Sequence, residues 1–450
     1  NNQGGGIMKI NSTYKVKIKH YNHIFKDTVT VYRDATDYII NVCLENWDYI
    51  SNIETNLNKK TYIENLIHKT KDNPNVSYDF DKRFYKLPSY IRRSAIAEAL
   101  GKVSSYKSNL SNWEDNLVEK AGKKPSLPVA GHIFPVLYRD NMYKQTGTYE
   151  AKVKIYIRNT WDWLTVKLRK SDINYINRHC QNRKHCVPAL RKRGKEWFLD
   201  FPFEENVKLN DTNVKDRTIV AVDLGINTAA TVSVMRSDGT ILERGFCSLN
   251  KEIDSLTHSL NHIKKAQQHG NRKMPRLWAK VKGINHDISS KTAHYIIGIA
   301  LKHQADVIVF EHLDIKGKKK GSIKQKLHMW RKAEVQEIVS NQAHHYGMRI
   351  SHICAKNTSR LAYDGSGKIL RGKDVGFKTN EICKFTTGKI YNCDLSASYN
   401  IGARYFIREL TKSLDVNSKL HIEAKVPQCC KRSTCTLSTL ISLNAELMSL

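Results

Sequence analysis

The chain has 450 residues, of which 40% are apolar, and this length and composition allow several domains with ordinary buried cores. Lys and Arg total 74 against 43 Asp and Glu, giving a formal net charge of +31. Nucleic acid is therefore the expected partner, and the alternative is a soluble protein that is merely basic. A membrane surface is disfavoured as a partner, because the sequence has no long uncharged apolar run and no signal-peptide pattern.

The first part of the chain is expected to contain strands followed by helices. Residues 1–7, Asn-Asn-Gln-Gly-Gly-Gly-Ile, precede Met8 and are expected to be a remnant outside the fold. Residues 9–33 alternate in the manner of strands, with apolar or aromatic side chains at Tyr14, Val16, Ile18, Val29, Val31 and Tyr32. Asp34 is expected to open a helical region that continues to about residue 120.

Two apolar stripes at helical spacing occur in this helical region. One lies within residues 39–47 and the other within residues 91–103, and Lys and Arg occupy the other faces. Such a basic helical lobe is suited to cradle a nucleic-acid duplex. A helical bundle with a solvated polar face explains the stripes equally well.

Strands are expected to return after residues 121–128, a Gly- and Pro-rich segment. The expected strands here are 150–157, 163–168 and 195–203. We therefore predict one β-barrel-like domain, formed by residues 8–33 and 121–212 and interrupted by the helical lobe of residues 34–120.

From residue 213 onward the pattern alternates strands and helices, which indicates an α/β layer structure. The expected strands are 218–222, 229–235, 305–310 and 348–354, with a hairpin turn at 237–239. The expected helices are 251–303, 321–346 and 394–410. The tail, residues 413–450, contains three cysteines and few signals that indicate a structure.

Three short acidic motifs lie in this layered region: V-A-V-D-L-G-I-N at 220–227, V-I-V-F-E-H-L-D at 307–314 and N-C-D-L-S-A-S-Y-N-I at 392–401. They place Asp223, Glu311 and Asp394 at the end of an apolar strand or the start of a helix. An isolated acid after a strand is more often a turn or cap residue. Glu311 follows Val-Ile-Val-Phe, however, and buried acids are rare without a partner or a metal. Convergent carboxylates suit two Mg²⁺ ions about 3.5–4 Å apart, as phosphodiester hydrolysis requires.

These motifs carry a resemblance to a known family. D-L-G-I-N at 223–227, V-F-E-H-L at 309–313 and D-L-S-A-S-Y-N-I at 394–401 resemble the three motifs of the RuvC-like nuclease domain of transposon-encoded TnpB proteins and of miniature type V CRISPR effectors, particularly subtype V-F. N-T-S-R at 357–360 resembles the start of the family's target-nucleic-acid-binding insert, and Asn-His-Asp at 285–287 resembles the helix before the second motif. The resemblance covers residues from about 195 to 410.

The resemblance implies a multidomain α+β fold. Its parts are a β wedge domain interrupted by a helical recognition lobe, as outlined above, and an α/β RuvC (RNase H-like) nuclease domain at 213–356 and 391–412. A small insert at 357–390 and the tail at 413–450 complete it. The resemblance also implies a cytoplasmic protein of a prokaryote.

By the same resemblance, Asp223, Glu311 and Asp394 are the metal-binding catalytic acids, with Mn²⁺ able to substitute for Mg²⁺. Arg360 occupies the position of an arginine that assists cleavage. Its guanidinium could make a bidentate contact with the scissile phosphate or a structural contact within a loop, and the sequence favours neither role. Asn400, six residues after Asp394, is a candidate to support the same site.

The cysteines depart from the family pattern. The ten cysteines are scattered and are expected to be reduced thiols. The family insert usually carries two Cys-x-x-Cys pairs for zinc, whereas residues 361–393 contain Cys383 and Cys393 alone. Because a closed zinc site normally needs four ligands, structural zinc is not expected here unless a distant residue such as Cys354 contributes. The run from His179 to Cys186, with two His and two Cys, is an irregular and disfavoured zinc candidate.

The implied partners are a guide RNA and target double-stranded DNA, with a second copy of the chain on one RNA, as in V-F effectors. The apolar stripes of 39–47 and 91–103 are candidate dimer contacts. Basic clusters that fit a long polyanion occur at 102–107, 189–195, 264–282 and 316–326. The alternatives are a transposon-associated TnpB-type nuclease, a guided DNA-binding protein that does not cut, and a resolvase-like nuclease that acts without RNA.

Overall fold

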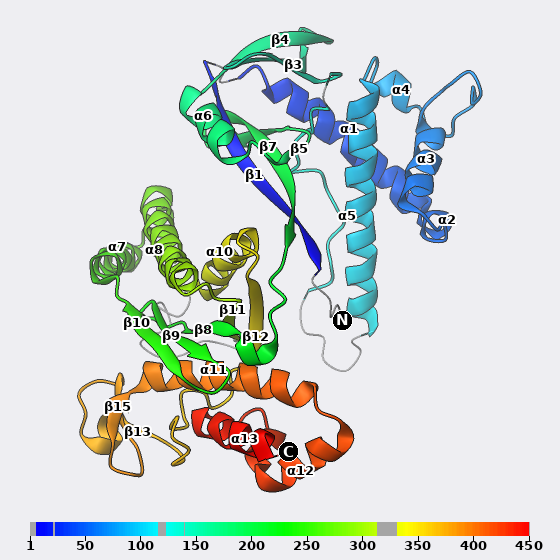
Figure 1. Cartoon of the computed structure of the whole chain (residues 1–450). Helices are drawn as coiled ribbons and strands as arrows, with labels where there is room; N and C mark the ends of the chain where they lie inside the picture. The colour runs from blue at the N-terminus through cyan, green and yellow to red at the C-terminus, as the bar shows by residue number, and fades with distance from the viewer. Residues whose placement is uncertain (1–5, 21–22, 116–122, 139, 313–330, 450) are drawn as a thin grey trace. The chain divides into compact units, whose positions relative to one another are not determined.

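The computed structural model describes residues 6–20, 23–115, 123–138, 140–312 and 331–449 (Figure 1). The chain divides into two compact units. The N-terminal unit is residues 11–205, and the C-terminal unit is residues 206–450 together with the first residues of the chain up to Ile10. Among the described helices, none is both long enough and apolar enough to cross a membrane.

The N-terminal unit is built on a curled, seven-stranded sheet with the order β2-β3-β4-β1-β7-β5, and β6 pairs with β7. Its strands are β1 (Ile7–Lys19), β2 (Tyr143–Gly147), β3 (Glu150–Ile157), β4 (Thr160–Leu168), β5 (Lys184–His185), β6 (Ala189–Arg193) and β7 (Glu196–Lys208). The alternation predicted for β3 is present: Ala151, Val153 and Ile155 are buried, and the residues between them are at least partly exposed.

Helices cover and flank this sheet: α1 (Lys26–Glu45), α2 (Trp47–Ser51), α3 (Asn56–Ile67), α4 (Phe80–Arg83), α5 (Ser89–Asp115) and α6 (Lys170–His179). The two apolar stripes lie on α1 and α5, and their buried residues, including Ile39, Cys43, Ile91 and Val103, belong to one core with the sheet. The stripes named as candidate dimer contacts are therefore used by the N-terminal unit for its own core, and their buried residues are covered within it.

Two local predictions near the start of the chain are wrong. Residues 29–33 are helical, since α1 begins at Lys26. Their β-branched residues favour strands locally, but Val29 and Tyr32 lie on the buried helix face, and tertiary packing overrides that preference. Ile7, expected to lie outside the fold, is the first residue of β1, because backbone pairing does not depend on side-chain type.

The C-terminal unit contains a five-stranded sheet with the order β10-β9-β8-β11-β12. Its strands are β8 (Thr218–Asp223), β9 (Ala230–Arg236), β10 (Ile241–Cys247), β11 (Val307–His312) and β12 (Arg349–Cys354). β11 pairs in parallel with β8 and β12, whereas β9 is antiparallel to β8 and β10. The four predicted strands are thus present, and β10 completes the predicted hairpin.

Helices cover both faces of this sheet (Figure 1). Side chains of α8 (Pro275–Lys302) and α10 (Lys332–His345) form one core with Val220, Val222 and Phe310. α11 (Cys393–Lys412) and α13 (Leu437–Ser449) form another with Ala221 and Val309. The unit also contains α7 (Asn250–Gln268), α12 (Val416–Lys425) and the short helices η1 (Val214–Asp216), η2 (Gly372–Val375) and η3 (Pro427–Cys430). This layered arrangement confirms the expected fold class.

The insert forms a small sheet with the order β13-β14-β15, made of Leu370–Arg371, Ile382–Lys384 and Ile390–Asn392. The predicted boundary at residue 390 divides β15, which pairs with β14 across it, so that boundary is wrong. Cys383 and Cys393 are buried together with Ala362 and Phe385 in an apolar cluster. The first part of the predicted helix at 321–346 and the basic cluster at 316–326 lie outside the described residues.

Candidate active site

Asp223 and Glu311 lie on neighbouring parallel strands. Asp223 is the last residue of β8, and the register of β8 and β11 pairs Val222 with Phe310. Asp223 and Glu311 are the next residues of their strands, so the two acids lie at the same level of the sheet. Side chains alternate between the faces of a strand. Asp223 therefore shares a face with Ala221, and Glu311 with Val309, and this is the face that α11 covers.

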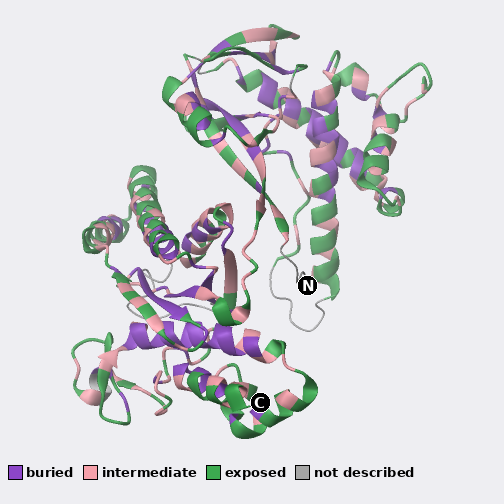
Figure 2. Ribbon diagram, viewed as in Figure 1, coloured by how far each residue is buried: buried purple, intermediate pink, exposed green. Residues whose placement is uncertain are grey.

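Asp394 approaches the same face from α11. The side chain of Asn392 caps this helix by accepting a hydrogen bond from the backbone N–H of Leu395 at 2.9 Å. Asp394 lies in the first turn, where the helix dipole favours a carboxylate. Figure 2 shows α11 buried along most of its length, which fixes its position against the sheet.

The electrostatics show that the three carboxylates are neighbours. Burial raises the pKa of Asp223 well above its usual range, and the negative charges of Glu311 and Asp394 raise it further. Burial also raises the pKa of Glu311 and of Asp394. Crowded, partly desolvated carboxylates form a region of strong negative potential inside a very basic protein, and such a region attracts cations.

The carboxylates do not form a closed ligand cage. Among the residues that the structure describes, no group of three or more His, Cys, Asp or Glu side chains is arranged to hold a metal ion. Within the described residues, neither the apolar cluster around Cys383 nor the run from His179 to Cys186 forms such a group. In that run Cys180 is buried and Cys186 is half-buried.

Thr358 contacts Glu311 directly. Glu311 is 7% exposed and Thr358 is 2% exposed, and the Thr358 hydroxyl donates a hydrogen bond to Glu311 Oε1. This bond lowers the pKa of Glu311 and partly offsets the effect of burial, as do the positive charges of Arg404 and Lys332. Thr358 belongs to the predicted N-T-S-R segment, but the sequence analysis assigned it no role.

Two buried side chains of α11 hold the turn that carries Thr358. Asn400 donates to the carbonyl oxygens of Thr358 and Leu361 at 3.0 and 2.9 Å and accepts from the N–H of Leu437 at 3.2 Å. Asn400 therefore connects the helix of Asp394 to the turn of Thr358 and to the tail. The sequence had suggested that it lies near the site, and its contacts show what it binds.

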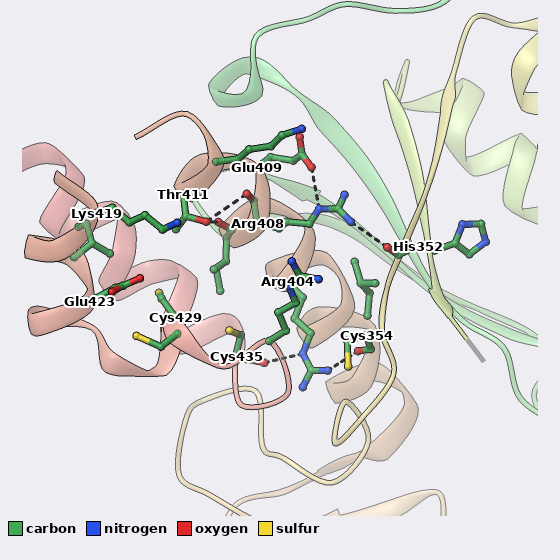
Figure 3. A pocket seen from close by; sticks show the side chains of 16 residues that line it. His352, Cys354, Arg404, Arg408, Glu409, Thr411, Lys419, Glu423, Cys429 and Cys435 are labelled. Carbon is green, nitrogen blue, oxygen red and sulfur yellow. Dashed lines mark hydrogen bonds and ion pairs between the residues drawn. The ribbon is translucent and has the colours of Figure 1, made fainter. Parts of the chain in front are cut away.

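Arg404 continues this connection one turn further along α11. Its guanidinium donates to the carbonyl oxygens of Cys354, Lys356, Ser433 and Cys435 at 2.6–3.1 Å. Figure 3 shows the bonds to Cys354 and Cys435. Two of these carbonyls lie between β12 and Thr358, and two lie in the tail. Sequence analysis missed Arg404, although an arginine inside the apolar run I-G-A-R-Y-F-I is a signal of a buried hydrogen-bonding role.

Arg360 lies at the end of the same turn, and its residue is exposed. Within the described part of the chain, no hydrogen bond or ion pair joins the Arg360 side chain to the three carboxylates. The structure therefore places Arg360 close in sequence to Thr358 without bringing it into the carboxylate cluster.

The three acids therefore lie at one end of the layered sheet, where β8, β11 and the first turn of α11 meet. Residues 201–321 match a family model described as probable transposase, and residues 12–157 match the model of the Aq_aa04 family. The chain is 27% identical over 234 residues to a TnpB-like protein, aq_aa05, of Aquifex aeolicus (strain VF5), a match that covers 47% of this chain and 74% of that protein. It is therefore similar to TnpB-like proteins, which confirms the resemblance carried by its motifs.

A second protein of the same organism, the uncharacterized protein aq_aa04, is 40% identical over 84 residues. That match covers 18% of this chain and 47% of that protein. Similar solved structures include a Cas12f1–sgRNA–target DNA complex, with 13% identity, 87% of this chain and 98% of that chain covered, and a TM-score of 0.33. Another is the mini-RNA-guided endonuclease CRISPR-Cas_phi3, with 11% identity, 89% and 93% covered, and a TM-score of 0.44. Since both TM-scores are below 0.5, the fold assignment rests on the topology described above.

Proposed function

We propose that this protein is an RNA-guided DNA endonuclease that hydrolyses phosphodiester bonds at the site formed by Asp223, Glu311 and Asp394. The observation that carries the proposal is the convergence of these three acids on one face of the sheet, where burial raises the pKa of all three and the charges of Glu311 and Asp394 raise the pKa of Asp223 further. Their order and motifs resemble those of TnpB-type nucleases, and the chain is similar to a TnpB-like protein over nearly half of its length.

The donor set fits divalent metal. Mg²⁺ prefers hard oxygen ligands and keeps several waters, so three carboxylates without a closed cage suffice, and Mn²⁺ can replace it. The repulsion between Asp223 and its two neighbours is what a divalent cation would relieve. Two bound ions would supply activation of the attacking water and stabilisation of the leaving oxygen.

The residues of this chain have separable tasks in the proposal. Asp223, at the end of β8, is the acid on which the charges of both other carboxylates act, and it would be a metal ligand. Thr358 holds one oxygen of Glu311 and leaves the other oxygen available for a ligand. Asp394 is held by the capped start of α11. Arg360, at the exposed end of the turn, would contact the DNA phosphate if it acts in cleavage.

The proposed partners are a guide RNA and target double-stranded DNA. The net charge of +31 supports a long polyanionic partner. Base pairing would supply the sequence specificity, and the protein would read a short flanking motif and duplex shape. We infer a V-F-like CRISPR effector with two copies on one RNA. The alternative, a transposon-associated TnpB-type nuclease, is favoured by the match to the probable transposase family.

Cleavage of a matched plasmid tests the proposal. The protein is purified with the RNA expressed from its native locus and incubated with Mg²⁺, beside an Asp223→Asn variant that keeps the side-chain shape. We expect guide-dependent cutting by the natural protein and none by the variant. Cutting that persists in Asp223→Asn would refute the site, and cutting without RNA would favour the resolvase-like reading. Equal RNA-dependent binding without cutting by either protein would favour the non-cleaving binder.

The mass of the ribonucleoprotein tests the stoichiometry. Two protein copies per RNA would support the V-F-like assignment. One copy per RNA would favour the TnpB-type alternative, and the nuclease site itself would be unaffected.

A further inference from the structure

The outer face of strands β2, β3 and β4 carries aromatic and basic side chains together. The register pairs Lys154 with Trp163, Tyr156 with Trp161 and Glu150 with Lys167 across β3 and β4. Residues paired in this way point to the same side of the sheet. We call this surface the Trp163 face, and it consists of Lys144, Lys152, Lys154, Tyr156, Trp161, Trp163 and Lys167.

The Trp163 face lies on the side of these strands opposite the buried core residues, although Trp161 also packs against the edge of that core. The alternate residues Ala151, Val153, Ile155 and Val166 are fully buried and belong to the opposite side of these strands. Figure 2 shows the resulting alternation of buried and exposed residues along β3 and β4. The aromatic rings of the face are half-buried, so they are held in place but remain partly accessible.

Two lysines cover the ring of Trp163. Lys144 Nζ lies 5.1 Å and Lys154 Nζ lies 5.9 Å from the ring centroid. Trp161 contacts Tyr156 with ring centroids 5.5 Å apart, which forms an aromatic pair on the same face. Each lysine stem is flexible, so a flat ligand can displace the ammonium group from the indole while the charge stays nearby.

The charge of the face is strongly one-sided. It has four lysines, and Glu150, opposite Lys167, is the one acid paired across these two strands with a residue of the face. Within the described residues, none of the four lysines forms an ion pair with a carboxylate. Unbalanced positive charge around an accessible indole fits a ligand that has both flat rings and negative charges.

We propose that the Trp163 face binds unpaired nucleotides of RNA. A base would stack on the indole of Trp163, and the lysines would contact the flanking phosphates. Stacking on aromatic side chains with backbone contacts from a basic surface is how proteins bind single strands, whereas bases in a duplex are not available for it. The proposal deepens the proposed function, because it locates on this chain a binding surface for single-stranded parts of its RNA partner.

Binding of a labelled oligouridine of about 12 nucleotides to the full-length protein tests this inference. Trp163→Ala should weaken binding by about tenfold, whereas Trp163→Phe should keep most of it because a stacking surface remains. The affinity for an RNA duplex of the same length should change by no more than about threefold in either variant, because a duplex has no unpaired base to stack on Trp163. Thermal unfolding verifies that both variants are folded.

A matched pair of charge reversals separates the local surface from the overall charge. Lys152→Glu with Lys167→Glu alters the face, and Lys425→Glu with Lys431→Glu makes the same charge change in the tail. We expect the first pair to weaken binding more and to reduce its salt dependence by about two phosphate contacts.

Three results would overturn the inference: equal binding by Trp163→Ala and the natural protein, equal losses on single-stranded and duplex RNA, or equal losses from the two charge reversals. The test is independent of cleavage. If guided cleavage fails but oligouridine binding depends on Trp163, the binding surface stands and the nuclease proposal fails. If cleavage succeeds and Trp163 has no effect, the inference about this face fails by itself.

Discussion

Replacing Thr358 by Val would isolate the contact that orients Glu311. Valine has nearly the same shape, so the change removes the hydroxyl that donates to Glu311 Oε1 and keeps the packing of a residue that is 2% exposed. A hydrogen bond to a charged group contributes about 1.5–3 kcal/mol. If the bond is kept in the transition state, its loss slows cleavage by about 10-fold to 100-fold.

The pH dependence of this variant has a defined sign. The Thr358 hydrogen bond lowers the pKa of Glu311, which burial raises. Without the hydroxyl, the pKa of Glu311 is higher, and a metal ligand must be ionised. The rising limb of the pH–rate profile of Thr358→Val should therefore move to higher pH, and the deficit should shrink as pH or metal concentration increases.

Single-turnover cleavage over a pH series, at two Mg²⁺ concentrations, measures both effects. Thr358→Ser is the matched control, because it keeps the hydroxyl and should retain most of the activity. A rate for Thr358→Val equal to that of the natural protein would refute the orienting role. So would a Thr358→Ser variant that is as slow as Thr358→Val, since packing rather than the hydroxyl would then be responsible.

Three further predictions concern the same unit. Asp223→Asn should raise the thermal stability of the metal-free protein while it abolishes cutting. Because the folded protein raises the pKa of Asp223, the protonated carboxyl costs no stability below the usual pKa of a carboxyl, and stability is lost as pH rises through the folded pKa. The gain in melting temperature of the variant should therefore be absent in acid and grow toward neutral pH. Arg404→Met should lower the free energy of unfolding in urea by about 3–5 kcal/mol because buried carbonyls lose their donor, whereas Arg408→Met, at a more exposed position, should cost under about 1 kcal/mol. Gly402→Ala should change the free energy of unfolding by less than about 1 kcal/mol, because its Cβ would lie 2.9 Å from the flexible end of the Met235 side chain, which can move, and because alanine favours the helix; a large drop in melting temperature would contradict this.

The strands and helices of the C-terminal unit could be predicted where burial is continuous. β8 and β11 are short runs of Val, Ile, Ala and Phe with both faces covered, and such runs are recognisable without knowledge of their neighbours. The acids that end these runs are visible for the same reason. That Asp223 and Glu311 lie side by side could be expected from the parallel pairing of an α/β sheet.

The parts that the sequence did not reveal depend on contacts between distant residues. Thr358 and Glu311 are 47 positions apart, and no local pattern indicates that a buried hydroxyl meets a buried carboxylate. The start of α1 was missed because Val29 belongs to a β-branched run whose helical face becomes visible only when the core is known. The tail supports the turn of Thr358 through the backbone carbonyls of Ser433 and Cys435, which carry no residue-specific signal.

The position of the candidate site depends on one helix that is tied at several points along its length. Asp394 lies in the first turn of α11, and Arg404 lies ten residues further, about 15 Å along the axis at 1.5 Å per residue. Arg404 nevertheless acts on the site, because it holds the chain between β12 and Thr358 and joins it to the tail at Ser433 and Cys435. A guanidinium with several backbone acceptors cannot move without leaving buried carbonyls unpaired. The tail therefore serves as the outer support of the turn that orients Glu311, although it contributes no carboxylate to the cluster.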